Sequence, residues 1–120
     1  MFEGESYVSL ATFRRDGRAV ETAVWFAEEA GRLWVFSEMK AGKIKRLRNS
    51  PRARVAACDV RGRVHGEWRD ASARVVDDPA AIAHALRLLH KKYGLMMRLA
   101  DFFARLSGRY ARRAYIEISI

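Results

Sequence analysis

The alternation of apolar and polar positions predicts a chain dominated by short strands. Tyr7–Phe13 is rich in β-branched and aromatic residues at a spacing close to two, and Ala19–Ala27 and Leu33–Ser37 show a similar pattern. Asp16-Gly17, between the first two segments, is a strong hairpin-turn signal. We therefore expect an antiparallel meander of three strands in the first third of the sequence.

The hydrophobic period changes in the next segment. Ile44 and Leu47 are three residues apart, and Pro51 disfavours helical geometry at the residue before it. We expect a short helix over Lys43–Asn49, with Ile44 and Leu47 facing inward and basic residues surrounding this narrow apolar stripe.

Further strands are expected in the second half of the sequence. Ala53–Val60 is a nearly continuous run of small apolar residues, which is typical of a strand buried on both faces. Val64–Arg69 and Ala71–Val76 alternate and predict two returning strands, and the closing AYIEISI predicts a final one. The total is six or seven strands.

A pair of helices is expected before the last strand. Asp78 and Pro79 form a good helix start, and Gly94 separates this helix from a second one over Leu95–Leu106. The expected core positions of the first helix are Ile82, Leu86 and Leu89. Those of the second are Met96, Leu99, Phe103 and Leu106. The fold class is therefore mainly β with helices, in a single domain over residues 1–120.

Positive charge is concentrated in one part of the sequence. The net charge is +9, and the window Lys40–Arg63 contains nine basic residues against one acid, Asp59. A solvated helix face and a binding site for an anion explain the stretch KAGKIKRLR about equally well. Basic residues on the following strand and turn favour the anion site, because they would converge on it; these are Arg52, Arg54 and Arg61.

Several classes of protein are not supported. Cys58 is the only cysteine, so no internal disulfide forms, and it makes no zinc-binding spacing with the three histidines. No Ser/His/Asp set or carboxylate pair suggests hydrolysis. No apolar run is long enough to span a membrane and no leader is evident, so a cytoplasmic protein is expected. A recognition helix or aromatic platform for nucleic acid is also lacking.

Three other features allow two interpretations each. Trp25, in AVWF, would line an aromatic ligand or, more commonly, pack in the core or a dimer interface. His65 would relay a proton or, more commonly, be structural. The segment Leu95–Leu106 would rest on a membrane surface or line a substrate pocket, although core packing is the commoner role of such a pattern.

The segment K-x-K-R-L-R-N-x-P-R, followed by C-D-x-R-G-R, resembles the pyridoxamine 5′-phosphate oxidase-like superfamily. The resemblance is to the actinobacterial branch of F420-dependent flavin or deazaflavin oxidoreductases, and it extends from Tyr7 to Val76, with the later elements in the same order. It implies a split β-barrel like that of FMN-binding proteins. It also implies a homodimer with a cofactor in each of two clefts at the interface.

The resemblance also implies a set of cofactor-binding residues. Val24 and Trp25 would lie along the ring system, and Ser37, Lys43 and Lys45 would hold the phosphate side, with Arg46 nearby. Arg61 and Gly62 would come from the adjoining turn, of this chain or of the partner. The excess positive charge fits the acidic tail of F420 better than FMN, which is the alternative cofactor.

The function implied is hydride transfer between reduced deazaflavin and an electron-poor organic acceptor. The alternatives are an FMN-binding reductase and a protein that holds the cofactor without turnover. No catalytic residue, metal ligand or acceptor is identified by the sequence. The chain departs from the family pattern in the strand beside the expected ring position, where many relatives have proline and this chain has Ala23.

Overall fold

Seven antiparallel strands form one sheet in the order β2-β1-β5-β6-β7-β4-β3 in the computed structural model, which describes all residues from 1 to 120. The strands are β1 (Tyr7–Phe13), β2 (Ala19–Val24), β3 (Ala27–Glu29), β4 (Arg32–Glu38), β5 (Arg52–Cys58), β6 (Arg69–Val76) and β7 (Arg113–Ser119). The helices are α1 (Gly42–Asn49), α2 (Pro79–Tyr93) and α3 (Leu95–Leu106), followed by the 3₁₀ turn η1 (Tyr110–Arg112).

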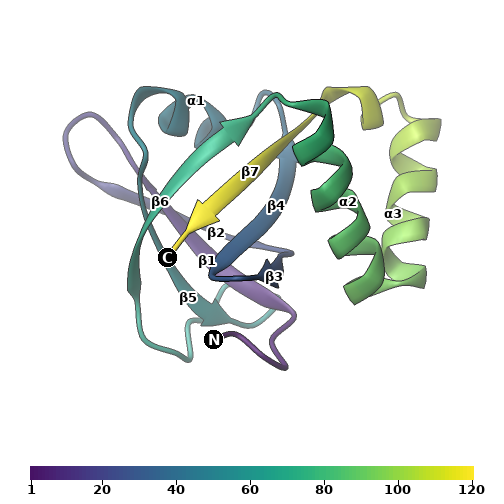
Figure 1. The fold of residues 1–120 in the computed structure, drawn as a ribbon. Coiled ribbons are helices and arrows are strands. Elements are labelled where there is room, and N and C mark those ends of the chain that lie inside the picture. Colours follow the sequence, from purple (N-terminus) through teal and green to yellow (C-terminus); the bar gives the residue numbers. More distant parts are fainter.

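The sheet closes into a barrel because its two edge strands are consecutive in the chain. β2 pairs with β1, β3 pairs with β4, and only Trp25 and Phe26 separate β2 from β3. The chain thus passes from one edge of the sheet to the other at these two residues (Figure 1). The single strand predicted over Ala19–Ala27 is therefore wrong in detail, and the short helix follows the fourth strand instead of the third.

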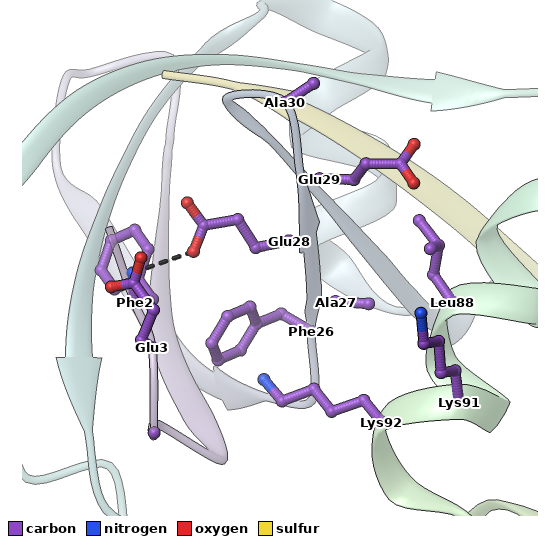
Figure 2. A pocket seen from close by; sticks show the side chains of 11 residues that line it. Phe2, Glu3, Phe26, Ala27, Glu28, Glu29, Ala30, Leu88, Lys91 and Lys92 are labelled. Atoms are coloured by element: carbon purple, nitrogen blue, oxygen red, sulfur yellow. Dashed lines mark hydrogen bonds between the residues drawn. The ribbon is translucent and has the colours of Figure 1, made fainter.

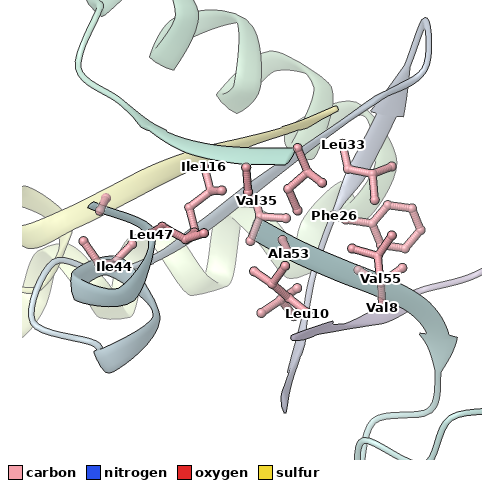
Figure 3. Packing of buried hydrophobic residues seen from close by; sticks show 14 of the residues in the cluster. Val8, Leu10, Phe26, Leu33, Val35, Ile44, Leu47, Ala53, Val55 and Ile116 are labelled. Atoms are coloured by element: carbon pink, nitrogen blue, oxygen red, sulfur yellow. The ribbon is translucent and has the colours of Figure 1, made fainter. Parts of the chain in front are cut away.

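The barrel encloses the main hydrophobic core, which α1 covers at one end. Side chains from most strands meet inside it, among them Val8, Leu10, Val35, Val55 and Ile116 (Figure 3). Ile44 and Leu47 of α1 are buried in the same cluster, as predicted from their spacing. Burying each of these two side chains stabilises the fold by roughly 1.5–3 kcal/mol, so α1 is held firmly over the barrel.

Helix α2 covers the outside of the barrel. Its start is confirmed: the Asp78 carboxylate accepts a hydrogen bond from the Ala80 N–H at 3.3 Å, and Pro79 occupies the first turn. Ala85 and Leu89 are fully buried, whereas Ile82 and Leu86 are only partly buried, against Trp34 and Tyr115 among others. Gly94, with φ 55°, ends the helix in a conformation that favours glycine.

The predicted core face of α3 is wrong. Met97 and Asp101 are the buried residues of this helix, whereas the four predicted core residues, Met96, Leu99, Phe103 and Leu106, are exposed. The reason is that α2 already covers the barrel, so α3 packs on α2 and forms the outer edge of the molecule (Figure 1). Periodicity identified the apolar stripe correctly but could not identify which side of the helix had a partner.

The predicted strand Val64–Arg69 is also wrong. Val64 forms only an isolated bridge with Cys58, and β6 begins at Arg69 and continues without a break to Val76. The carboxylate of Asp59 accepts hydrogen bonds from the N–H groups of Arg61 and Arg63, both at 2.9 Å, and so forms a tight turn. The following loop passes over β5 so closely that a Cβ on Gly66 would lie 3.2 Å from that of Ala57.

Candidate functional site

Helix α1 begins shortly after the end of β4, and no side chain caps the backbone N–H groups of its first turn. Ala41, at the N-cap position, provides no side-chain hydrogen bond, and the first turn contains no acidic residue. The backbone N–H groups of a helix start carry partial positive charge and bind anions well when nothing else caps them. A phosphate is the commonest biological group that such a start binds.

Lys43 lies beside this helix start and connects it to β4. Its Nζ donates a hydrogen bond to Ser37 Oγ at 3.0 Å. Burial lowers the pKa of Lys43, the nearby charge of Arg46 lowers it further, and Glu38 partly offsets both effects. The structure thus brings together two of the predicted phosphate-binding residues, Ser37 and Lys43.

Arg46 folds back over the same helix start. Its Nε donates to Oγ1 of the fully buried Thr12 at 2.7 Å, and a Cβ on Gly42 would lie only 2.7 Å from its Nη1. Burial lowers the pKa of Arg46, and repulsion from Arg14 adds to this. Lys43 and Arg46 are therefore neighbouring cations, and neither forms an ion pair with a carboxylate. A bound anion would relieve their repulsion.

A basic hollow adjoins Arg46, between the β1–β2 hairpin and the end of α1. Its volume is about 510 Å³, and it contains four arginines and no acidic residue; its lining is Phe13, Arg14, Arg15, Gly17, Arg46, Asn49, Ser50 and Arg52. The Arg52 guanidinium stacks on Phe13, 3.9 Å from the ring centroid. Arg14 and Arg15 were not predicted as site residues, because only the tertiary fold brings their hairpin to α1.

The side chains of Val24 and Trp25 pack against other residues of the chain. Val24 is buried in the barrel core. Trp25 stacks on Tyr93 of α2, with ring centroids 4.6 Å apart and planes inclined by 14°, and its edge meets Phe36. Contact with a flavin ring would therefore involve mainly the backbone of Val24 and Trp25.

The remaining predicted residues are separate from Ser37 and Lys43. Lys45 points into solvent on the exposed side of α1. Arg61 is exposed, and Gly62, with φ 86°, lies next to Ala23, whose Cβ is 4.0 Å from the position of an added Cβ. The Arg61–Gly62 turn thus lies beside the end of β2, at the end of the barrel away from α1 (Figure 1).

A second hollow, of about 620 Å³, lies between β3 and α2 (Figure 2). Three carboxylates line it, from Glu3, Glu28 and Glu29, together with Lys91 and Lys92. Burial lowers the pKa of Lys92 to about 8, with Glu28 and Glu5 acting in the opposite direction. Its excess of acidic groups makes this hollow a poorer phosphate site than the start of α1.

No group of three or more His, Cys, Asp or Glu side chains is arranged to hold a metal ion. None of the helices combines the length and apolar character that crossing a membrane requires.

Comparison with known proteins places the chain in a family. A family profile described as "Pyridoxamine 5′-phosphate oxidase" matches residues 1–120. No curated protein matches the sequence significantly.

Solved structures share the fold. The haem storage protein HutZ from Vibrio cholerae has a TM-score of 0.72 at 14% identity, covering 98% of this chain and 82% of its own. An FAD-binding protein from Mesorhizobium loti has a TM-score of 0.61 at 21% identity, covering 96% and 78%. A protein described as an F420 reductase has a TM-score of 0.56 at 21% identity, covering 98% and 88%. At these identities the likeness concerns the fold.

Proposed function

Since the chain belongs to the pyridoxamine 5′-phosphate oxidase family, we propose that it is an oxidoreductase that binds a flavin or deazaflavin. The phosphate of the cofactor would lie at the start of α1. The observation that carries this proposal is the pair of half-buried cations, Lys43 and Arg46, beside a helix start without a cap. Ser37 and Thr12 fix the two side chains, so the site is organised before an anion binds.

Coenzyme F420 is the cofactor we favour over FMN. The hollow lined by Arg14, Arg15, Arg46 and Arg52 shares Arg46 with the proposed phosphate position and contains no acid. It suits a cofactor with negative charge beyond its phosphate, and the acidic tail of F420 provides such charge. The folds that this chain resembles include an F420 reductase and an FAD-binding protein, which agrees with either type of ring.

The cofactor, when bound, would supply hydride transfer to an electron-poor organic acceptor. The chain's own residues would bind and orient it: Lys43 and Arg46 the phosphate, and the backbone around Val24 and Trp25 the ring. No side chain of the chain is assigned as a proton donor. A cytoplasmic location belongs to the same proposal.

A homodimer is part of this proposal. The β5–β6 connection, which contains Arg61 and Gly62, lies at the end of the barrel away from α1 (Figure 1). Within one chain this turn is therefore beside the expected ring position, and it would meet the phosphate side of a cofactor only if it came from a second copy. Two equivalent sites would then lie across a two-fold interface, which is the commonest symmetry of soluble oligomers.

The test is titration of the purified protein with F420 and with FMN, followed by fluorescence. Lys43→Met should weaken binding of the preferred cofactor by about tenfold or more, because a charge-assisted hydrogen bond contributes roughly 1.5–3 kcal/mol. Arg48→Met removes the same charge from an exposed position of α1 and should have little effect. Unchanged affinity in Lys43→Met would show that the phosphate site is elsewhere.

Two further measurements separate the alternatives. If the hollow holds the acidic tail, the double variant Arg14→Gln, Arg52→Gln should have a lower affinity for F420 and an unchanged affinity for FMN. Turnover with a panel of quinones, enones and tetrapyrroles separates an enzyme from a protein that only holds the cofactor. Tight binding without hydride transfer to any member of the panel would favour the second function.

A further inference from the structure

The outward side of α3 exposes a continuous row of large apolar side chains. The exposed fractions range from 49% for Leu99 to 75% for Leu106, and the full set, called here the apolar face of α3, is Leu95, Met96, Leu99, Phe102, Phe103 and Leu106. At 3.6 residues per turn these six side chains fall within an arc of roughly 120°. They point away from α2, on which the helix packs through Met97 and Asp101.

This face is unusual for a surface that meets only water. Single exposed leucines are common, but contiguous patches of this kind generally mark a site of association. The position of α3 makes the face accessible, because the helix forms the outer edge of the molecule and nothing in the fold lies over it (Figure 1).

The charges beside the face have one sign. Arg98 and Arg105 follow one border of it, and Arg112 lies beyond the end of the helix. Arg109 is positive too, but its Nε lies 3.8 Å from Glu38, which partly neutralises its charge. The only acid between Leu95 and Arg112 is Asp101, which is buried and faces the opposite way, where its Oδ1 accepts a hydrogen bond from Arg113 at 2.6 Å. A partner must therefore supply both an apolar interior and negative charge at its edge.

We propose that α3 docks the protein on the surface of a membrane that contains anionic lipids. The apolar face would enter the boundary between headgroups and acyl chains, and Arg98 and Arg105 would meet lipid phosphates. A helix of 12 residues is about 18 Å long and can lie flat in this layer. A second copy of the chain fits less well, because it would bring the same arginines and no exposed carboxylate to this face.

The test is flotation of the full-length protein with lipid vesicles. We expect binding to vesicles of phosphatidylcholine and phosphatidylglycerol, weaker binding to phosphatidylcholine alone, and a decrease as salt is raised. The double variant Phe102→Gln, Phe103→Gln should lose at least about tenfold in partitioning, because it removes two aromatic side chains from the buried layer. Val60→Gln is the matched control, since Val60 is 65% exposed in the β5–β6 connection.

A charge variant tests whether Arg98 and Arg105 contact lipid phosphates. Arg98→Gln with Arg105→Gln should lower partitioning to anionic vesicles by roughly tenfold. Arg63→Gln with Arg69→Gln removes equal charge from exposed positions elsewhere and should change it little. All these side chains are exposed, so circular dichroism and thermal unfolding should show unchanged folding. Equal losses in the two charge variants would overturn the role of α3 and indicate attraction by net charge alone.

Two other results would also overturn the proposal. One is the absence of flotation with either vesicle. The other is a phenylalanine variant whose oligomeric state, measured by sedimentation velocity, changes while its vesicle binding does not. That result would assign the apolar face of α3 to contact between copies of the chain. The α3 variants should bind the cofactor as the wild type does. Failure of the membrane proposal would therefore leave the proposed function untouched, and failure of the proposed function would leave the membrane proposal untouched.

Discussion

Arg46 Nε donates a hydrogen bond at 2.7 Å to Oγ1 of Thr12, a fully buried residue 34 positions earlier in the chain. This contact joins α1 to β1 and fixes the guanidinium over the start of the helix. Thr12 therefore stabilises the fold and also organises the proposed phosphate site, although its own side chain would not touch the cofactor.

Thr12→Val tests this relationship. The substitution removes the hydroxyl and keeps nearly the same volume, so the free energy of unfolding should fall by about 1–3 kcal/mol and cofactor affinity should fall as well. Thr22→Val is the matched control: Oγ1 of Thr22 is buried and makes no hydrogen bond, so its removal should be neutral or stabilising. Urea unfolding and cofactor titration check both variants. Wild-type affinity in Thr12→Val would show that Arg46 does not depend on this contact.

Asp101 connects the helical pair to the barrel. Its carboxylate lies between Arg113 of β7, at 2.6 Å, and His90 of α2, at 2.7 Å, and both Asp101 and Arg113 are nearly inaccessible. Asp101→Ala should lower the free energy of unfolding by about 3 kcal/mol, because it leaves the Arg113 guanidinium buried without a counter-charge. Stacking of Arg113 on Phe36 limits the loss.

The control for this prediction is Asp70→Ala. Asp70 pairs with Arg54 at 3.2 Å, but its side chain is almost fully exposed. Such a surface pair contributes between zero and about 1 kcal/mol, so the variant should unfold nearly as the wild type does. Similar destabilisation of both variants, in thermal unfolding followed by circular dichroism, would contradict the structural role of Asp101.

Local patterns predicted most of the fold. The spacing of Ile44 and Leu47 before Pro51 identified α1 and its inward face, and Tyr7–Phe13 and Leu95–Leu106 were predicted with the bounds that the structure shows. These features depend on residues close together in the sequence. The orientation of α3 depends instead on what α2 already covers, which no local period contains.

The candidate site shows the same division. Ser37 and Lys43 are six positions apart and were predicted together, whereas Thr12 reaches Arg46 only through the tertiary fold. The whole predicted set came from a family resemblance, and its part in cofactor binding stays a prediction; besides Ser37, Lys43 and Arg46 it contains Val24, Trp25, Lys45, Arg61 and Gly62. The burial of the Trp25 side chain against Tyr93 depends on α2, which lies far away in the sequence.

Tyr93 fixes the point at which the chain passes from β2 to β3. Its hydroxyl oxygen accepts from the Phe26 N–H at 2.9 Å and lies 2.7 Å from the carbonyl oxygen of Ser6, to which it donates. Tyr93→Phe leaves the Phe26 N–H without its partner and should lower the free energy of unfolding by about 1–3 kcal/mol. Hydrogen exchange of the Phe26 amide should become faster.

The matched control is Tyr7→Phe, which removes a hydroxyl from a half-buried tyrosine of β1. Stacking of residue 93 on Trp25 should survive in Tyr93→Phe, so the tryptophan fluorescence spectrum should be unchanged. Slow exchange at Phe26 in Tyr93→Phe would mean that another group protects this amide.

The pKa of Lys92 makes stability depend on pH in alkaline solution. Its Nζ lies 3.2 Å from the centroid of the Phe26 ring (Figure 2), and burial lowers its pKa from 10.5 to about 8. Below pH 8 both the folded and the unfolded chain hold the proton, so this residue contributes no slope. Between pH 8 and 10.5 the unfolded chain binds more protons than the folded one, and stability from this residue therefore rises with pH.

Lys92→Met should remove this rise, whereas Lys91→Met, one position away in α2, should keep it. Urea unfolding at several pH values measures the difference between each variant and the wild type, which cancels other groups such as Tyr93, whose pKa burial raises to about 12. The slope should be shallow, because the Lys92 side chain is exposed at the surface and solvent screens its charge. An identical pH dependence in the wild type and Lys92→Met would mean that the Lys92 ammonium is solvated and does not rest on the Phe26 ring.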